Sequence, residues 1–216
     1  MNQAWIAETE AFLKEAFARS AWLQAHPADG AYRLQHSYRV ANIAKGIAER
    51  EGFDVTEAVI AGLLHDIAYC EELATREDWK NHGRRSAAIA RPFLERLGLR
   101  PERVNGICYG IAIHVDDQAG FEGERTPFSE TVGDADNIDR FDAYRIYETL
   151  EYRKFSQISL EEQWEIVDST LERLEKLREM KLGTPTATAI WVQRLEDYSA
   201  FYKKLRAQLA SSAAIL

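Results

Sequence analysis

Apolar residues recur every three or four positions along most of this chain, which is the pattern of amphipathic helices. A clear example starts at His36, which is followed at four, seven and eleven positions by Val40, Ile43 and Ile47. No stretch of useful length alternates apolar and polar residues in the way that a half-buried strand does. The pattern therefore predicts an all-α protein.

Capping and turn residues divide this pattern into separate helices. With 216 residues we expect a single domain over residues 1–216, with a core that carries the motifs at about 30–150 and a C-terminal helical extension at about 158–210. The expected helices are 5–18, a segment around His36 that ends before Gly52, a segment capped by Thr56 that continues through Ile67, 81–98, 101–114, a segment from Ser129 through Asp136, 160–180 and 186–209.

An imidazole and a carboxylate stand side by side in the segment Leu63-Leu64-His65-Asp66-Ile67, inside what reads as an otherwise apolar helix. Burying this pair without a partner would cost several kcal/mol. A metal ion is the simplest partner for both groups, so the segment predicts a metal site.

Further polar residues fall on faces that the pattern predicts to be buried. His36 belongs to the apolar stripe described above, and His114 ends a similar seam. His82 begins the inner face of its helix, and Asp136 follows Val132 by one turn. A single inward histidine is most often a hydrogen-bonded core residue, and an inward aspartate is most often a cap or an ion-pair partner. His26, next to a proline, has no apolar register and is expected at the surface.

Six such groups need a shared explanation if their helices converge. Neutral imidazoles and carboxylates form a nitrogen and oxygen ligand set that suits Mn, Fe, Co, Ni or Zn better than calcium. We therefore predict a site for one or two divalent transition-metal ions. Its candidate ligands are His36, His65, Asp66, His82, His114 and Asp136.

Composition narrows the class of protein. A hydrophobic content of 46% with five tryptophans supports a substantial core, and a net charge of −8 argues against general attraction to nucleic acid polymers or anionic membranes. No apolar run is long enough to span a bilayer, and the N-terminus lacks the pattern of a signal peptide. Cys70 and Cys108 are too few for a disulfide scaffold, so we expect reduced thiols and a cytoplasmic protein.

The ordered set His36, His65-Asp66 and Asp136 resembles the HD superfamily of metal-dependent phosphohydrolases. The flanking residues agree, in the runs His36-Ser37-Tyr38-Arg39-Val40, Ala61-Gly62-Leu63-Leu64-His65-Asp66-Ile67-Ala68 and Ala135-Asp136-Asn137-Ile138-Asp139. The resemblance covers about residues 30–150 and implies an HD-domain helical bundle, here with additional C-terminal helices. It implies that the four residues bind a divalent metal. In some branches two further histidines, which His82 and His114 resemble, hold a second ion or contact a phosphate.

The resemblance also implies a reaction, the hydrolysis of a phosphoester or phosphoanhydride in a small phosphorylated molecule or nucleotide. Asp66 would bind the metal and orient the attacking water, and His114 would assist the leaving group. Several nucleotide-acting members carry a lysine three residues after the aspartate of the pair, where this chain has Tyr69. The candidates to replace that positive charge are Lys80, Arg84 and Arg140, although each could instead be a solvated surface charge.

Two other functions share these motifs. A few HD-type proteins use a di-iron site for oxidative cleavage by O₂, and the ligand order does not separate them from hydrolases. The chain could also be a non-catalytic module that binds a metal or a nucleotide in regulation. A stripe on the C-terminal extension would then serve a homodimer or simply pack on its own domain; it consists of Trp164, Val167, Leu171 and Leu174.

Overall fold

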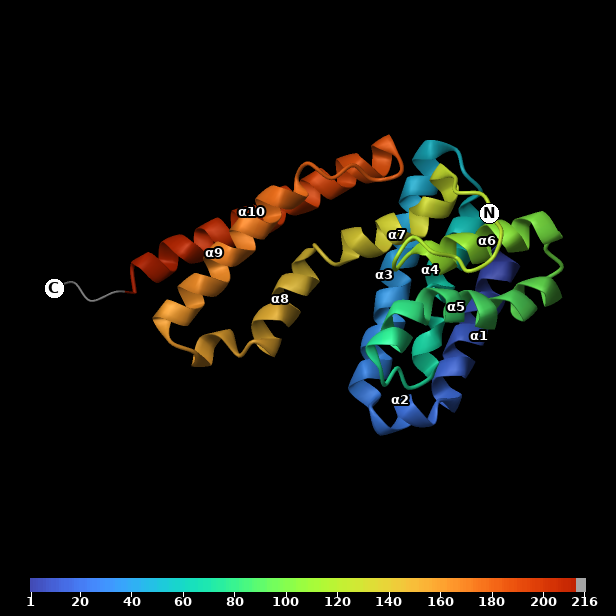
Figure 1. The fold of residues 1–216 in the computed structure, drawn as a ribbon, viewed down its shortest axis with the longest axis horizontal. Helices are drawn as coiled ribbons and strands as arrows, with labels where there is room; N and C mark the ends of the chain where they lie inside the picture. Colours follow the sequence, from blue (N-terminus) through green and yellow to red (C-terminus); the bar gives the residue numbers. More distant parts are fainter. Residues whose placement is uncertain (213–216) are drawn as a thin grey trace. The chain divides into compact units, whose positions relative to one another are not determined.

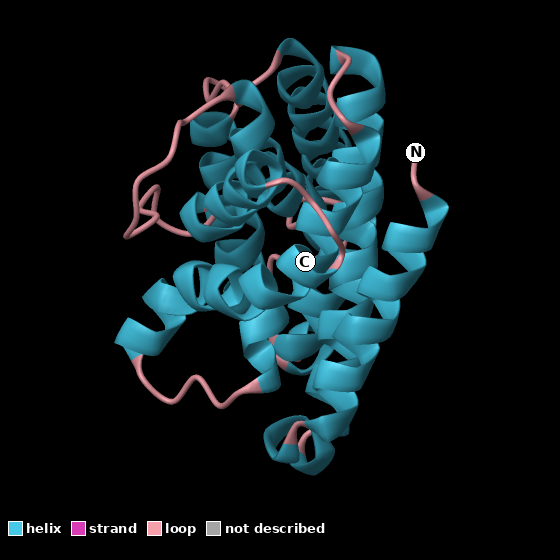
Figure 2. Ribbon diagram, turned by 90° about the vertical axis from the view of Figure 1, so that its right-hand side faces the viewer, coloured by secondary structure: helices cyan, strands magenta, loops and turns pink. Residues whose placement is uncertain are grey.

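The computed structural model describes residues 1–212, which form helices joined by turns and loops, with no strand among them (Figures 1 and 2). The prediction of an all-α fold is confirmed. The chain divides into two compact units, Met1–Asp136 and Asn137–Leu216, and each is described here by itself. The expectation of one domain over residues 1–216 stays a prediction.

The first unit is a bundle around helix α4. Because α4 is apolar on every side, it can only be stable when other helices surround it, and α1, α3, α5 and α6 all pack against it. Its residues 58–64 are all buried. The elements of this unit are α1 (Gln3–Arg19), α2 (Ala21–Ala25), α3 (Pro27–Glu51), α4 (Val55–Leu64), the 3₁₀ turn η1 (Ile67–Cys70), α5 (Arg76–Arg96), α6 (Pro101–Ile113) and α7 (Pro127–Asp139), whose last turn crosses into the second unit.

Helix α4 ends earlier than the apolar pattern predicts. The expectation that His65 and Asp66 lie inside a helix is wrong, because α4 stops at Leu64 and Asp66 has φ −108° and ψ 16°, outside the helical region. The turn that follows is held to α5 by a hydrogen bond from the Ala68 N–H to the Ser86 hydroxyl, 3.1 Å. Because the helix breaks here, both side chains of the pair point into the protein, which a continuous helix would not allow.

Several predicted boundaries also differ from the structure. Asp54, not Thr56, caps α4, and Thr56 lies buried in its first turn. Helix α5 starts at Arg76 instead of residue 81, because Thr75 and Asp78 form a reciprocal capping box in what reads as a polar loop. His26 is half-buried between α2 and α3, with its ring tilted against that of Trp22 at 3.8 Å between centroids, so the expectation of a surface residue is corrected.

The second unit consists of α8 (Ala143–Tyr152), the 3₁₀ turn η2 (Phe155–Gln157), α9 (Leu160–Leu177) and α10 (Pro185–Ala210). Helices α9 and α10 lie side by side, and Trp191 and Tyr202 of α10 are fully buried. Helix α8 is absent from the predicted series of helices. Within residues 1–212, no helix is both long and apolar enough to cross a membrane.

Candidate metal centre

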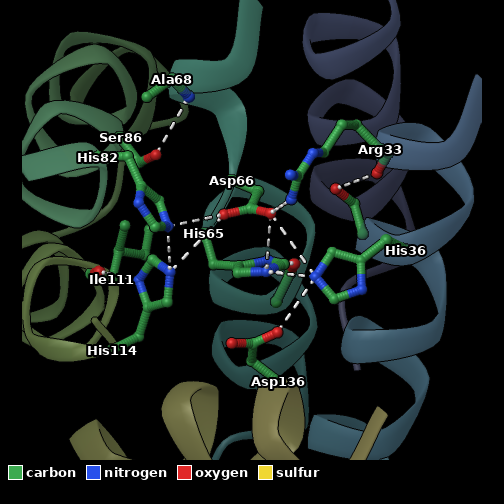
Figure 3. Close-up of polar contacts among 12 residues, drawn as sticks. Arg33, His36, His65, Asp66, Ala68, His82, Ser86, Ile111, His114 and Asp136 are labelled. Carbon is green, nitrogen blue, oxygen red and sulfur yellow. Dashed lines mark hydrogen bonds and ion pairs between the residues drawn. The ribbon is translucent and has the colours of Figure 1, made fainter. Parts of the chain in front are cut away.

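The structure brings the six predicted ligands together in the first unit, although they come from five helices (Figure 3). His36 lies on α3, His82 on α5 and Asp136 on α7, while His114 caps the end of α6. His65 and Asp66 follow α4 directly. For His36, His82, His114 and Asp136 the helical register that placed each group on an inner face leads to this place, whereas His65 and Asp66 reach it from the turn after α4.

His36, His65, Asp66 and Asp136 form the first cluster. The Nε2 atoms of His36 and His65 are 3.2 Å apart, and each lies 3.6 Å from Oδ2 of Asp66. Oδ1 of Asp136 lies 3.2 Å from the same Nε2 atom of His36. The ligand atoms of His36, His65 and Asp66 thus all lie within 4.8 Å of one another, and Asp136 adds a carboxylate oxygen beside His36.

His82, His114 and Asp66 form the second cluster. The Nε2 atoms of His82 and His114 are 3.1 Å apart, and they lie 3.2 and 3.6 Å from Oδ1 of Asp66. Asp66 therefore presents one oxygen to each cluster, and its carboxylate lies between them (Figure 3).

Backbone carbonyls orient three of the imidazoles. The Nδ1 atoms of His65, His82 and His114 lie 2.8, 2.5 and 2.6 Å from the carbonyl oxygens of the residues three positions earlier. A carbonyl can only accept, so each Nδ1 carries the proton and each Nε2 directs a lone pair into its cluster. This is the usual way in which proteins prepare histidine as a metal ligand.

The arrangement fits a metal ion better than an ordinary polar core. When two Nε2 lone pairs face each other at about 3 Å, they repel unless a proton or a cation lies between them. The Asp66 and His65 side chains are also almost completely buried, and a charge in such a place needs a partner. Two groups of three, His36-His65-Asp66 and Asp66-His82-His114, have the proximity that a cation requires.

Burial and the neighbouring charges separate the protonation states of the cluster. Burial lowers the pKa of His65 to about 4, against the influence of the Asp66 charge. Burial would raise the pKa of Asp66, but the neighbouring histidines and Arg33 hold it well below its usual range. Burial also opposes the charged form of His114, but the hydrogen bond and charge of Asp66 raise its pKa above the usual value. His65 is thus neutral near pH 7, whereas His114 retains a proton more readily.

Arg33 is a site residue that the sequence reasoning missed. Its Nη1 donates to Oδ2 of Asp66 at 2.9 Å, and its guanidinium lies over the Tyr69 ring at 3.4 Å from the centroid. Arg33 precedes His36 by three positions on α3, which places both side chains on one helical face, and Tyr69 follows Asp66 by three positions in the turn η1. That spacing is the signal that could have found it.

Two of the three predicted substrate-binding residues, Lys80 and Arg84, lie one turn apart on α5, where Arg84 donates to the Lys80 carbonyl at 3.2 Å. The Arg84 guanidinium binds Asp116 at 2.7 Å and the Gln118 carbonyl at 2.7 Å, so it holds the loop after α6. Lys80 is exposed on α5, and Arg140 belongs to the second unit.

Glycine allows two of the ligand-bearing helices to approach their neighbours. A Cβ on Gly62, three residues before His65, would lie 2.6 Å from Cα of Ala41 on α3. A Cβ on Gly83, next to His82, would lie 2.7 Å from the carbonyl oxygen of Ala112 on α6. Any larger residue would push these helices apart, so the two glycines set the spacing of the clusters.

Comparison with known proteins gives a family and a fold. The HD domain family matches residues 33–144. A solved structure of a predicted HD superfamily hydrolase from an uncultured Thermotogales bacterium superimposes with a TM-score of 0.65 at 22% identity, and the match covers 94% of this chain and 91% of that one. None of the curated proteins matches this chain.

Proposed function

Because the chain belongs to the HD-domain family, we propose that it is a metal-dependent hydrolase that cleaves a phosphoester or phosphoanhydride bond in a small nucleotide-like molecule. The observation that carries this proposal is the Asp66 carboxylate, which lies between two clusters of imidazoles. Five helices converge to build this arrangement, which is more than a degenerate site or a structural ion would need.

A bound divalent ion supplies Lewis acidity, which makes water a nucleophile at neutral pH and polarises a phosphoryl oxygen. The first ion would be held by His36, His65, Asp66 and Asp136, and a second by His82, His114 and Asp66. With two ions all six of these imidazoles and carboxylates would act as ligands. With one ion, His82 and His114 remain to contact a phosphate, and the raised pKa of His114 suits it to donate a proton to the leaving group.

Arg33 supports a phosphorylated substrate. It brings a positive charge to Asp66, whereas Tyr69 occupies the position of the lysine found in several nucleotide-acting members. The Tyr69 ring lies under the guanidinium and holds it in place. Arg33 is therefore our candidate for the phosphate contact, because it reaches the carboxylate that both clusters share, whereas Arg84 is bound to Asp116 in the loop after α6.

Trp79 supports a nucleotide-like substrate. Its side chain is half exposed beside the second cluster, with its ring centroid 6.0 Å from that of His82. An indole face open to solvent offers a surface on which a base can stack. The Trp79 carbonyl also orients His82, so the position of the indole is tied to that of a ligand.

The first experiment is elemental analysis of protein purified without added metal or chelator, followed by a screen of phosphoesters and phosphoanhydrides. We expect two equivalents of Mn, Co, Ni, Zn or Fe, and release of phosphate or a nucleoside monophosphate. His36→Ala and His82→Ala should each lose one equivalent, while Asp66→Ala should lose both, together with turnover. His26→Gln is the matched control, since His26 lies outside both clusters.

The outcomes separate the competing functions. Full turnover by Asp66→Ala would refute the proposed site. Two irons, together with oxygen uptake in the presence of substrate, would replace the hydrolase with a di-iron oxygenase. A metal-loaded protein that binds a nucleotide tightly without turning it over would be a regulatory module.

Two further expectations belong to the same proposal. Cys70 and Cys108 are free thiols, which agrees with a cytoplasmic protein that acts on a small soluble phosphate compound. Within the predicted C-terminal stripe, Val167 and Leu174 are buried in their own unit, and Trp164 is 40% exposed. A homodimer through this stripe would therefore use Trp164 at its centre.

A further inference from the structure

A cavity of about 190 Å³ lies in the second unit, and none of the six candidate metal ligands lines it. Four arginines line it, and no carboxylate does. The lining residues come from the turn after α7, from α8 and its end, from α9 and from α10; they are Arg140, Phe141, Arg145, Thr149, Arg153, Thr170, Arg173, Leu174 and Tyr198. Four positive charges gather at this one cavity, although the chain as a whole has a net charge of −8.

We propose that this cavity, which we call the arginine pocket, binds a small multiply charged oxyanion: phosphate, pyrophosphate or the phosphate group of a small organic molecule. Guanidinium groups bind such oxygens through paired hydrogen bonds, and several together outweigh the cost of removing the anion from water. Without an anion, four like charges around one cavity repel one another.

Aromatic neighbours hold Arg173 in place at the pocket. The Arg173 guanidinium lies over the Phe141 ring at 5.3 Å from the centroid, and Phe141 packs against the buried Trp191 at 4.9 Å.

The positive charges of the pocket are only partly balanced by carboxylates. Neither Arg153 nor Arg173 makes an ion pair within residues 1–212, whereas Arg145 pairs with Glu148 at 2.9 Å. Two of the four charges are therefore not neutralised by a carboxylate of the described chain.

The pocket wall also carries hydroxyl-bearing residues. Thr170 and Tyr198 line the pocket, and both are neighbours of the buried Tyr202. A wall of arginines and hydroxyl-bearing residues suits an oxyanion better than an apolar ligand.

The volume limits the size of the ligand. Binding sites for drug-sized molecules occupy about 300–1,000 Å³. The arginine pocket is smaller, so it fits one or two phosphate groups better than a complete nucleotide. This inference does not depend on the proposed hydrolase activity, because the residues involved differ and the test below uses protein without metal.

The test is calorimetric titration of pyrophosphate into the full chain after removal of metal, so that no ion in the first unit can bind the probe. We expect one site per chain. The double variant Arg153→Gln/Arg173→Gln should weaken binding about a hundredfold, since each arginine contributes a charge-assisted hydrogen bond. Arg173→Lys keeps the charge but loses the paired geometry, so it should bind with intermediate affinity.

The matched control is Arg178→Gln/Arg206→Gln, which removes the same charge from the same unit. These two arginines lie outside the pocket, in ion pairs with Glu196 and Asp168. Circular dichroism checks that each variant is folded. Equal loss in the control, unchanged binding in the pocket variant, or no binding by the wild-type chain would overturn the proposal.

Two further titrations identify the source of the anion. Inorganic phosphate and glycerol phosphate are compared with pyrophosphate under the same conditions. Tighter binding of pyrophosphate indicates a free polyanion, and tighter binding of glycerol phosphate indicates an organic phosphate. Either preference supports the proposal if the Arg153→Gln/Arg173→Gln variant no longer shows that preference.

Discussion

At the scale of single residues, Arg33 and His114 show how the surroundings of a group change what it can do. Arg33 reads in the sequence as an ordinary charge on a helix, but it donates to Asp66 and stacks on Tyr69. His114 reads as one of several inward histidines, but the contact with Asp66 raises its pKa. Neither property follows from residue type or spacing alone, because both depend on a partner that lies about 30 positions away in the chain or further.

We predict that Arg33→Gln lowers kcat/KM by about 10- to 100-fold, because it removes a charge-assisted hydrogen bond beside the reacting phosphate. Arg33→Lys should restore part of the loss. Steady-state kinetics on the substrate found in the phosphoester screen measures both. Arg85→Gln is the control, since Arg85 is exposed and pairs with Glu71. A variant with unchanged kcat/KM would remove Arg33 from the site.

Metal uptake should release protons. Only the neutral imidazole binds a metal, and in the metal-free protein Asp66 raises the pKa of His114. Below that pKa a proton must leave before the ion can bind. The affinity for Mn²⁺ should therefore rise with pH through the pKa of His114 and level off above it. Calorimetry in buffers of different ionisation enthalpy counts the protons, and a count of zero near pH 6.5 would contradict this assignment.

At the scale of elements, the sequence predicts which faces of the helices are buried, but it does not predict where α4 ends. The buried faces that carry His36, His82 and His114 follow from apolar spacing, and the structure brings these faces together. The end of α4 at Leu64 has no clear signal in the sequence, because apolar residues resume at Ile67 and no glycine or proline lies between Leu64 and Ala68. The turn that follows is bonded to a distant helix, through the hydrogen bond from Ala68 to Ser86.

The short helix α8 was missed for a related reason. It has ten residues and a single buried position, Ile146, so its apolar repeat is too short to stand out. The start of α5 was missed because its first three residues, 76–78, are charged and lie on the surface. The rest of the site, including the distance between the two clusters, could not be predicted from the sequence because it depends on how the helices pack.

The contact between α3 and α4 provides a test of that packing. Gly62→Ala should destabilise the protein by about 1–3 kcal/mol, because the added methyl group would meet the backbone of Ala41. It should also lower metal content, since α3 carries His36 and α4 leads to His65. Gly46→Ala on α3 is the matched control: nothing lies within 4 Å of its Cβ, so it should stabilise by about 0.5–1 kcal/mol. Urea denaturation followed by circular dichroism measures both, and equal effects would contradict the close approach.

At the scale of the whole molecule, the two units differ in what can stabilise them. All six candidate ligands lie in Met1–Asp136, whereas the arginine pocket lies in Asn137–Leu216. Metal and oxyanion should therefore act on different parts of the chain. This difference also makes the predicted single domain testable, since one cooperative unit would respond to either ligand as a whole.

Removal of metal should lower the unfolding temperature by about 10 °C. An ion present at a thousand times its dissociation constant adds about 4 kcal/mol to the stability of the unit that binds it, and for a chain of this size each kcal/mol moves the transition by about 2–4 °C. Scanning calorimetry with and without a chelator measures the shift. His26→Gln should behave like the wild type, and Asp66→Ala, which lacks the carboxylate shared by both clusters, should show no response to the chelator.

The position of Asp66 has a consequence for how the site fills. Its two oxygens face different clusters, so any cation at one cluster changes the charge that the carboxylate presents to the other. The two binding events then form one coupled equilibrium instead of two independent ones. The coupling free energy is the same in both directions, so whatever the first ion does to the affinity for the second, the second does to the first.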